Sequence, residues 1–162
     1  MNDPVVMVPA WQRNDAKIAK DATDFWLKLR ALPRTVSPEK RLQELCAAAY
    51  VGDELVGVST IELDQSPLLR CRLGLYRCLV SPAHAHRRIV NRLTLYSRAL
   101  LESWSKEHPG EKVLGMAAIL DNPNFDIIAK RPMWRGSNLW LIGYTPEGLQ
   151  IRLTWFEHAR LE

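Results

Sequence analysis

Residues 78–104, CLVSPAHAHRRIVNRLTLYSRALLESW, constrain the fold of this chain more than any other stretch. An apolar run typical of a strand leads into Ser-Pro, a basic turn follows, and a long amphipathic helix comes next. The helix has one apolar stripe, formed by Ile89, Leu93, Tyr96, Leu100 and Trp104. This layout presents a helix N-terminus to an anion, as in phosphate-binding loops. The turn, however, has none of the glycines that let a phosphate approach the backbone.

The rest of the chain alternates between strand patterns and helix patterns. Strand patterns cover residues 5–9, 46–63, 68–80, 112–120 and 138–156, and the segments 46–63 and 138–156 each contain a hairpin turn signal. Helix patterns cover residues 14–32, 37–45 and 122–131, in addition to the helix after residue 88. The order predicts an α/β fold, β-α-α-β-β-β-α-β-α-β-β, with a mixed central sheet, helices on both faces and a single domain over residues 1–162.

The composition limits the classes of protein that fit. No apolar run reaches the roughly 18 to 20 residues that cross a bilayer, and the N-terminus lacks the pattern of a signal peptide. Three cysteines without a CxxC spacing predict reduced thiols and a cytoplasmic protein, and four histidines show no metal-ligand spacing. The net charge of +4 fits anionic partners such as a phosphorylated cofactor or an acidic protein, and it does not point to nucleic acid.

The order of elements, together with Val80-Ser81-Pro82 at the end of a strand, resembles the GNAT superfamily of acyl-CoA-dependent N-acyltransferases. In that family the V-x-P segment is followed by Arg or Gln and then by two glycines at the start of a helix. Here these three positions hold Ala85, Arg88 and Val90. A later tyrosine of the family, often the general acid, corresponds to Ala129. The resemblance therefore indicates a divergent member with a degenerate acyl-CoA motif.

The resemblance implies that the cofactor is acetyl-CoA or another acyl-CoA, bound at the end of this strand. The amide of Leu79 or Val80 would stabilise the oxyanion, and the helix N-terminus would hold the phosphates. Arginine and histidine side chains of the turn, with Arg92 one turn further on, would replace part of the backbone cradle. The cofactor-binding residues expected are Leu79, Val80, His86, Arg87, Arg88, Ile89, Val90 and Asn122.

Catalysis needs a general base that removes a proton from the attacking amine. Glu62, near the end of a predicted strand, is the first candidate for this base, and Asp64 is the second. Tyr144 is the other expected catalytic residue. The acceptor would be a small-molecule or peptide amine, held in a pocket shaped by the first two helices and the last hairpin. Trp26, Trp140 and Tyr144 would supply its apolar walls.

Three functions stay open at this point. The first is N-acyl transfer from an acyl-CoA-type thioester to a primary amine. In the second, the donor is an acyl carrier protein, whose acidic surface would dock on Arg70, Arg72 and the basic turn. The third is a binding or interaction protein that has kept the fold and lost catalysis. Each is compatible with a homodimer formed through a strand edge or the last hairpin.

Overall fold

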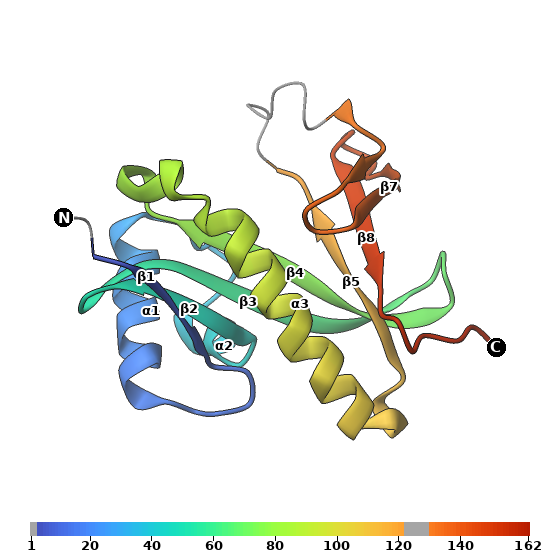
Figure 1. Cartoon of the computed structure of the whole chain (residues 1–162), viewed down its shortest axis with the longest axis horizontal. Coiled ribbons are helices and arrows are strands. Elements are labelled where there is room, and N and C mark those ends of the chain that lie inside the picture. Colours follow the sequence, from blue (N-terminus) through green and yellow to red (C-terminus); the bar gives the residue numbers. More distant parts are fainter. Residues whose placement is uncertain (1–2, 122–129) are drawn as a thin grey trace. The chain divides into compact units, whose positions relative to one another are not determined.

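The computed structural model describes residues 3–121 and 130–162 (Figure 1). Its strands are β1 (Val5–Pro9), β2 (Leu45–Val51), β3 (Glu54–Ser66), β4 (Cys71–Val80), β5 (Val113–Ile119), β6 (Met133–Trp134), β7 (Leu139–Tyr144) and β8 (Gln150–Trp155). Its helices are α1 (Ala16–Lys28), α2 (Pro38–Leu42) and α3 (Ile89–Glu107), with short 3₁₀ helices η1 (Pro82–Arg87) and η2 (Pro109–Glu111). Most of the helix predicted at residues 122–131 lies outside the described residues.

Hydrogen-bonded neighbours in the sheet follow the order β1-β2-β3-β4-β5-β8-β7-β6. The sheet is mixed, as predicted, because β4 and β5 are parallel and the other pairs for which a register is given are antiparallel. The chain divides into two compact units, Met1–Ile61 with Cys78–Leu100, and Glu62–Arg77 with Leu101–Glu162. Within the described ranges, no helix combines the length and apolarity needed to cross a membrane.

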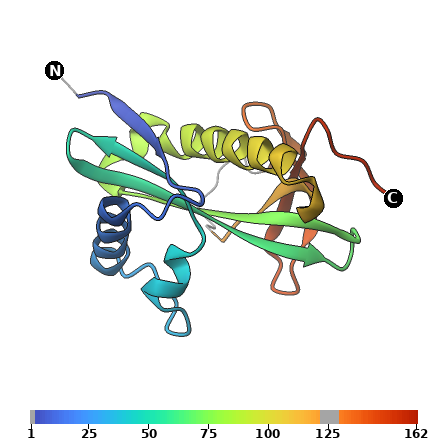
Figure 2. The same ribbon diagram turned by 90° about the horizontal axis from the view of Figure 1, so that it is seen from below.

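In the first unit, the strands separate two layers of helices. Alternate residues of β2 face opposite sides, so that Ala48 and Tyr50 pack with α1, whereas Ala47 and Ala49 pack with α3. Because both faces are covered, β2 is an almost continuous apolar run. Figure 2 shows α1 and α2 on one side of these strands and α3 on the other, which confirms the prediction of helices on both faces.

Helix α1 is bounded by two local signals. Asp15 is its N-cap, because Asp15 Oδ1 accepts a hydrogen bond from the Ile18 amide at 3.0 Å. The apolar pattern continues to residue 32, yet the helix ends at Lys28 because Arg30 has a φ of 51°. The Ala31 amide then donates to the Trp26 carbonyl (3.0 Å), as in a Schellman motif. The predicted end of this helix was therefore four residues too late.

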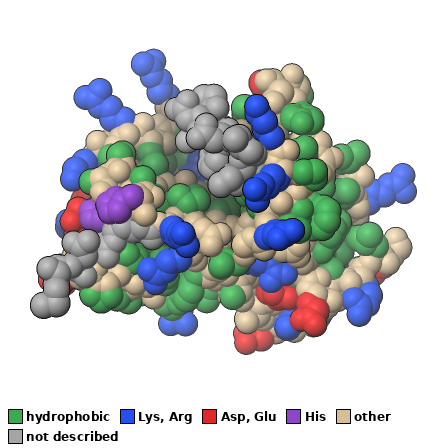
Figure 3. Space-filling view, turned by 45° about the horizontal axis from the view of Figure 1, so that its top comes forward, with side chains coloured by type: hydrophobic (Ala, Val, Ile, Leu, Met, Phe, Trp, Pro, Cys, Tyr) green, Lys and Arg blue, Asp and Glu red, His purple; other side chains and the backbone are tan. Residues whose placement is uncertain are grey.

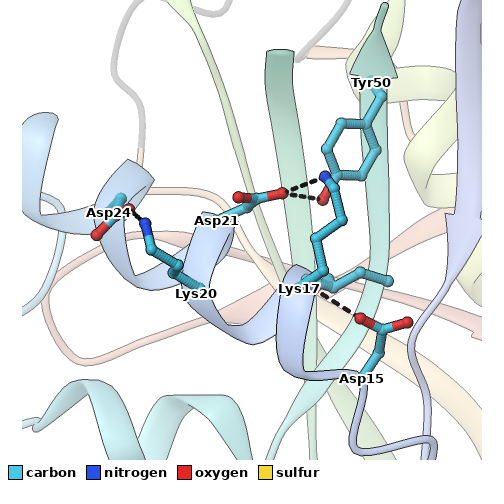
Figure 4. A network of polar contacts seen from close by, with 7 residues as sticks. Asp15, Lys17, Lys20, Asp21, Asp24 and Tyr50 are labelled. Carbon is cyan, nitrogen blue, oxygen red and sulfur yellow. Dashed lines mark hydrogen bonds and ion pairs between the residues drawn. The ribbon is translucent and has the colours of Figure 1, made fainter. Parts of the chain in front are cut away.

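A carboxylate on α1 joins this helix to β2 (Figure 4). Asp21 Oδ2 accepts hydrogen bonds from Lys17 Nζ and from the Tyr50 hydroxyl, each at 2.7 Å. The Lys17 ammonium also lies 4.6 Å from the centroid of the Tyr50 ring. The hydrogen bond from Lys17 is the main reason that the pKa of Asp21 is lowered, whereas burial is the main reason that the pKa of Tyr50 is raised.

Both predicted hairpins are present, and each turns at a glycine. Gly52, between β2 and β3, has a φ of 57°, and Gly148, between β7 and β8, has a φ of 85°. Glycine adopts positive φ at little cost, which explains its use at both turns. The two-residue strand β6 was not predicted, because it is defined only by its pairing with β7 and has no pattern of its own.

In the second unit, β5 lies between β4 and β8. Its Gly115 pairs with Trp155 of β8, where the two backbones approach closely. A Cβ at this glycine would lie 2.7 Å from the Thr154 carbonyl oxygen, a distance that requires the backbone to shift. One buried apolar cluster of this unit contains Cys71, Leu73, Ala117 and Leu153.

We expect Gly115→Ala to lower the free energy of unfolding by about 2–3 kcal/mol, because the added methyl group forces β5 and β8 apart. Urea denaturation measures this loss. Gly143→Ala is a matched control in the same unit, since a Cβ there would meet nothing within 4 Å. The control should stay within about 0.5 kcal/mol of the parent. Equal stabilities for the two variants would contradict the close approach of β5 and β8.

The side chain of Arg152 on β8 is fully buried, with 0% of its surface exposed. Its Nε donates to Gln150 Oε1 at 3.0 Å, its Nη1 to the Leu139 carbonyl at 3.3 Å, and its Nη2 to the Arg131 carbonyl at 2.7 Å. The guanidinium lies 4.0 Å from the centroid of the Trp134 ring. Burial lowers the pKa of Arg152. One side chain thus joins β8 to β6 and to the start of β7.

Candidate active site

The last residues of β4 direct their amides alternately toward β3 and away from it. The Ser81 amide donates to the Val56 carbonyl of β3 at 2.8 Å, and a Cβ on Gly57 would lie 3.4 Å from the Val80 side chain, which places Gly57 opposite Val80. Amides of successive residues in a strand point to opposite sides. The Leu79 amide therefore points toward β3 and the Val80 amide points away from it. Of the two predicted oxyanion donors, only Val80 has an amide directed away from the β3 pairing.

The parallel pairing of β4 with β5 ends before this point. Its register runs from Arg72↔Val113 to Tyr76↔Ala118. Val80 comes after the last residue of this register and directly before the turn that leads into α3. A backbone donor at this position can bind a substrate carbonyl, which is what an oxyanion site requires.

The turn after β4 keeps a glycine-like conformation without a glycine. Residues Pro82–Arg87 form η1, and Arg88 then adopts the left-handed conformation, with φ 55° and ψ 28°. The Arg92 amide donates to the Arg88 carbonyl (3.2 Å), so α3 begins directly after Arg88. Arg88 is the position that holds the first glycine in the GNAT motif. The backbone shape explains why a glycine suits this position, and arginine adopts it at a cost.

We expect Arg88→Gly to leave the free energy of unfolding unchanged or to raise it by up to about 1 kcal/mol. Arg88→Val should lower it by more than about 1 kcal/mol, because β-branched residues tolerate positive φ poorly. Thermal unfolding of the two variants measures the difference. If valine and glycine were equally stable at residue 88, the left-handed conformation would be wrong.

Gly57 allows the N-terminal part of α3 to pack closely against β3. A Cβ at Gly57 would lie 3.0 Å from Leu93 Cδ1 and 3.1 Å from Ile89 Cγ2, closer than ordinary van der Waals contact. The helix can approach β3 because this residue has no side chain. Gly57 was not among the predicted site residues, although a glycine inside a strand pattern is a recognised signal of such an approach.

The predicted phosphate-binding side chains have different positions. His86 and Arg88 are exposed, whereas the Ile89 side chain is fully buried in the core and can offer only its amide. Arg92, expected to grip phosphate, instead donates through Nη2 to the Val5 carbonyl of β1 at 2.9 Å. Asn122 and the side chain of Arg87 lie outside the part of the chain that the structure describes.

The contact of Arg92 also shields the open edge of β1. The Ala10 amide donates to the Cys46 carbonyl of β2 (2.9 Å), so the backbone groups of Val5 and Pro9 point outward by alternation. Arg92 covers the outward carbonyl of Val5, and Pro9 has no amide hydrogen. At Val5 and Pro9, these features disfavour pairing of the β1 edge with another strand.

The predicted base is held in an ion pair. Glu62 Oε2 accepts a hydrogen bond from Arg77 Nη2 at 2.9 Å, and both side chains are about 40% exposed. A carboxylate has a second oxygen with its own lone pairs, so Glu62 can still accept a proton or a hydrogen bond through Oε1. Asp64, the second candidate, is exposed. Arg77 was not predicted as a partner of Glu62.

The aromatic residues expected around the acceptor fall into two groups. Tyr144 and Trp140 on β7 are 60% and 49% exposed, so both are accessible to a substrate. Trp26, by contrast, is only 4% exposed and packs in the core between α1 and the sheet. Its prediction as a pocket wall was therefore wrong. The apolar stripe of a helix has the same sequence pattern whether its residues pack in the core or line a pocket, so the pattern could not distinguish the two.

A hollow of about 220 Å³ lies in the first unit beside Ser81. Its lining residues are Asp21, Asp24, Phe25, Lys28, Leu29, Asp53, Glu54, Leu55 and Ser81. Four of these nine residues are acidic and one is basic. It contains none of the predicted catalytic or cofactor-binding residues.

The residues at the start of α3 suit one phosphate group better than a diphosphate. A diphosphate lies closely against consecutive backbone amides, an approach that residues without a Cβ permit. Here Arg88 and Val90 both carry a Cβ, and the Val90 side chain is 43% exposed. The first amides of α3 have no partner within the helix and can still bind an anion.

Neither a family model nor a curated protein sequence matches this chain. Solved structures do match it. An acetyltransferase of the GNAT family from Streptococcus pneumoniae has a TM-score of 0.58 at 10% identity, over 94% of this chain and 100% of that one. The ribosomal-protein-S5-alanine acetyltransferase of Vibrio fischeri has a TM-score of 0.58 at 10% identity, over 97% and 94%. The yncA protein of Salmonella typhimurium, solved with its cofactor acetyl-CoA, has a TM-score of 0.55 at 16% identity, over 96% of both chains.

These similarities define the class of fold. These three structures match nearly the whole chain, and the one from Streptococcus pneumoniae is an acetyltransferase of the GNAT family. This chain therefore has the GNAT fold, as the sequence resemblance predicted. A fold does not determine an activity, and the activity has to be argued from the residues of the site.

Proposed function

We propose that this protein is an N-acyltransferase that moves an acyl group from a pantetheine thioester, of which acetyl-CoA and other acyl-CoAs are examples, to a primary amine. The observation that carries the proposal is the direction of the Val80 amide, which points away from β3 where β4 leads into α3. The fold supports it, because similar structures are acetyltransferases and one contains acetyl-CoA.

The reaction needs an oxyanion donor, a base and an acid, besides a site for the phosphate of the donor. Val80 and the first amides of α3 belong to the first unit, and Glu62 and Tyr144, the proposed base and acid, belong to the second. The amine nitrogen attacks the thioester carbonyl carbon, a C–N bond forms, and the Val80 amide donates to the resulting oxyanion. Glu62 takes the proton that the amine loses. The C–S bond then breaks, and the Tyr144 hydroxyl supplies a proton to the departing thiolate. The first amides of α3 hold the phosphate of the donor.

We expect Glu62→Gln to lower turnover by about 100-fold, since a positioned general base contributes 10²–10⁴-fold. The measurement is the pH–rate profile of amine-dependent thiol release. Asp64→Asn, which neutralises an exposed carboxylate on the same strand, should leave the profile unchanged. A Glu62→Gln enzyme with the parental rate and profile would exclude Glu62 as the base.

The activity itself is tested by incubating the protein with a pantetheine thioester and a panel of primary amines, both small molecules and peptides. Mass spectrometry should find an amine that gains the mass of the acyl group, and the amount of acylated amine should equal the amount of free thiol released. Without an acylated amine or a bound donor, the protein would instead be a binding or interaction protein with the GNAT fold, and the proposal would be wrong.

A further inference from the structure

We propose that an acidic carrier protein delivers the acyl group and docks on the outer side of α3. This inference rests on the proposed acyl transfer and identifies the donor. In a carrier protein, the pantetheine arm is joined to a serine through a single phosphodiester. Coenzyme A holds the same arm on a diphosphate, with an adenosine phosphate beyond it.

The segment that would meet the donor carries basic side chains and no acidic ones. Residues 78–101 contain four arginines and two histidines but neither aspartate nor glutamate, and the next carboxylate along the chain is Glu102. Charge complementarity of this kind selects an acidic partner and steers its approach. Lys and Arg side chains (blue) are spread over the face that Figure 3 shows, whereas red side chains gather mainly at its lower right.

The arginines lie beside an exposed apolar residue on one side of α3. Within α3, Asn91, Leu95 and the half-buried Arg98 follow a spacing of four and three residues, so they lie on one side of the helix. These three residues, together with Arg88 directly before the helix, are here called the α3 outer face. Leu95 is 42% exposed, and Asn91 and Arg88 are exposed as well. The opposite side, with Ile89, Leu93 and Ser97, is buried. An apolar contact surrounded by positive charge fits an acidic helix of a partner protein.

The α3 outer face is continuous with the place proposed for the phosphate. It begins at Arg88, directly before the first amides of α3. There the side chains of Arg88 and Val90 disfavour a diphosphate against the backbone, whereas one phosphodiester can bind the end of the helix. Arg92 contributes its charge while its side chain stays bonded to Val5. A carrier protein on this face would thus place its phosphopantetheine beside Val80.

Binding of octanoyl-loaded acyl carrier protein and of octanoyl-CoA, measured by calorimetry at low and high salt, tests the inference. We expect the carrier protein to bind at least tenfold more tightly than octanoyl-CoA at low salt, and to weaken at 0.5 M salt as charges are screened. Leu95→Glu adds a like charge at an exposed position and should weaken carrier-protein binding at least tenfold. Lys40→Glu, a charge reversal at an exposed residue of α2 on the other side of the strands, should change it less than twofold.

The outcomes separate this inference from the proposed function. If octanoyl-CoA binds as tightly as the loaded carrier protein, or if Leu95→Glu leaves carrier-protein binding unchanged, the inference is wrong and acyl transfer stands. If neither donor binds and neither releases thiol in the presence of amines, the proposed function is wrong as well.

Discussion

Val80→Pro is expected to lower the rate of acyl transfer by 10²–10³-fold, the effect of removing one oxyanion donor. Proline has no amide hydrogen, and the amide of Val80 points away from β3, so the hydrogen bonds between β3 and β4 stay in place. The loss should appear in the rate of amine-dependent thiol release, with the unfolding midpoint close to that of the parent.

Val80→Ala is the matched control, because it removes most of the side chain and keeps the amide. The alanine variant shows how much of any loss in rate comes from the side-chain contacts of Val80 with the cluster around Ile89 and Leu93. The control should retain a rate within a few-fold of the parent. Equal rates for the proline and alanine variants would show that this amide has no part in the chemistry.

The largest effect on stability is expected for Arg152→Met, which should lower the free energy of unfolding by about 3 kcal/mol. Methionine retains an apolar chain and removes the donors that Gln150, Leu139 and Arg131 accept from. A buried acceptor left without its donor costs roughly 1–3 kcal/mol. Relief of the cost of burying the charge offsets part of the total.

Thermal unfolding measures this effect, and a loss of 3 kcal/mol corresponds to a shift of about 6–12 °C for a chain of this length. Arg160→Met is the control, because Arg160 is an exposed arginine that also donates to backbone carbonyls. Its midpoint should shift by less than about 2 °C. A midpoint for Arg152→Met equal to that of the control would contradict the role assigned to Arg152.

Most of the fold could be predicted because its elements are set by local signals. Ser37 and Pro38 start α2 as an N-cap and first helical residue, and Gly52 turns the first hairpin. The end of α1 could not be predicted, since Arg30 takes a conformation usually held by glycine or asparagine.

The candidate site was only partly predictable, because contacts between distant residues leave no local pattern. Arg92 lies 87 residues from Val5, to which it donates, and a basic residue after a Ser-Pro turn gives no sign of that partner. Arg72, expected to dock an acidic protein, is paired with Glu111. The choice between the amides of Leu79 and Val80 also needed the register of β3 and β4, since both lie on the same predicted strand.

The central claim is that a pantetheine thioester binds where β4 ends and α3 begins. The most direct measurement is an NMR titration of the ¹⁵N-labelled protein with S-acetyl-phosphopantetheine. We expect shifts in the amide signals of Val80, Ile89, Val90 and Asn91, with smaller changes at Leu79, whose amide points toward β3. Shifts confined to the hollow lined by Asp53 and Glu54, or none at millimolar ligand, would contradict it.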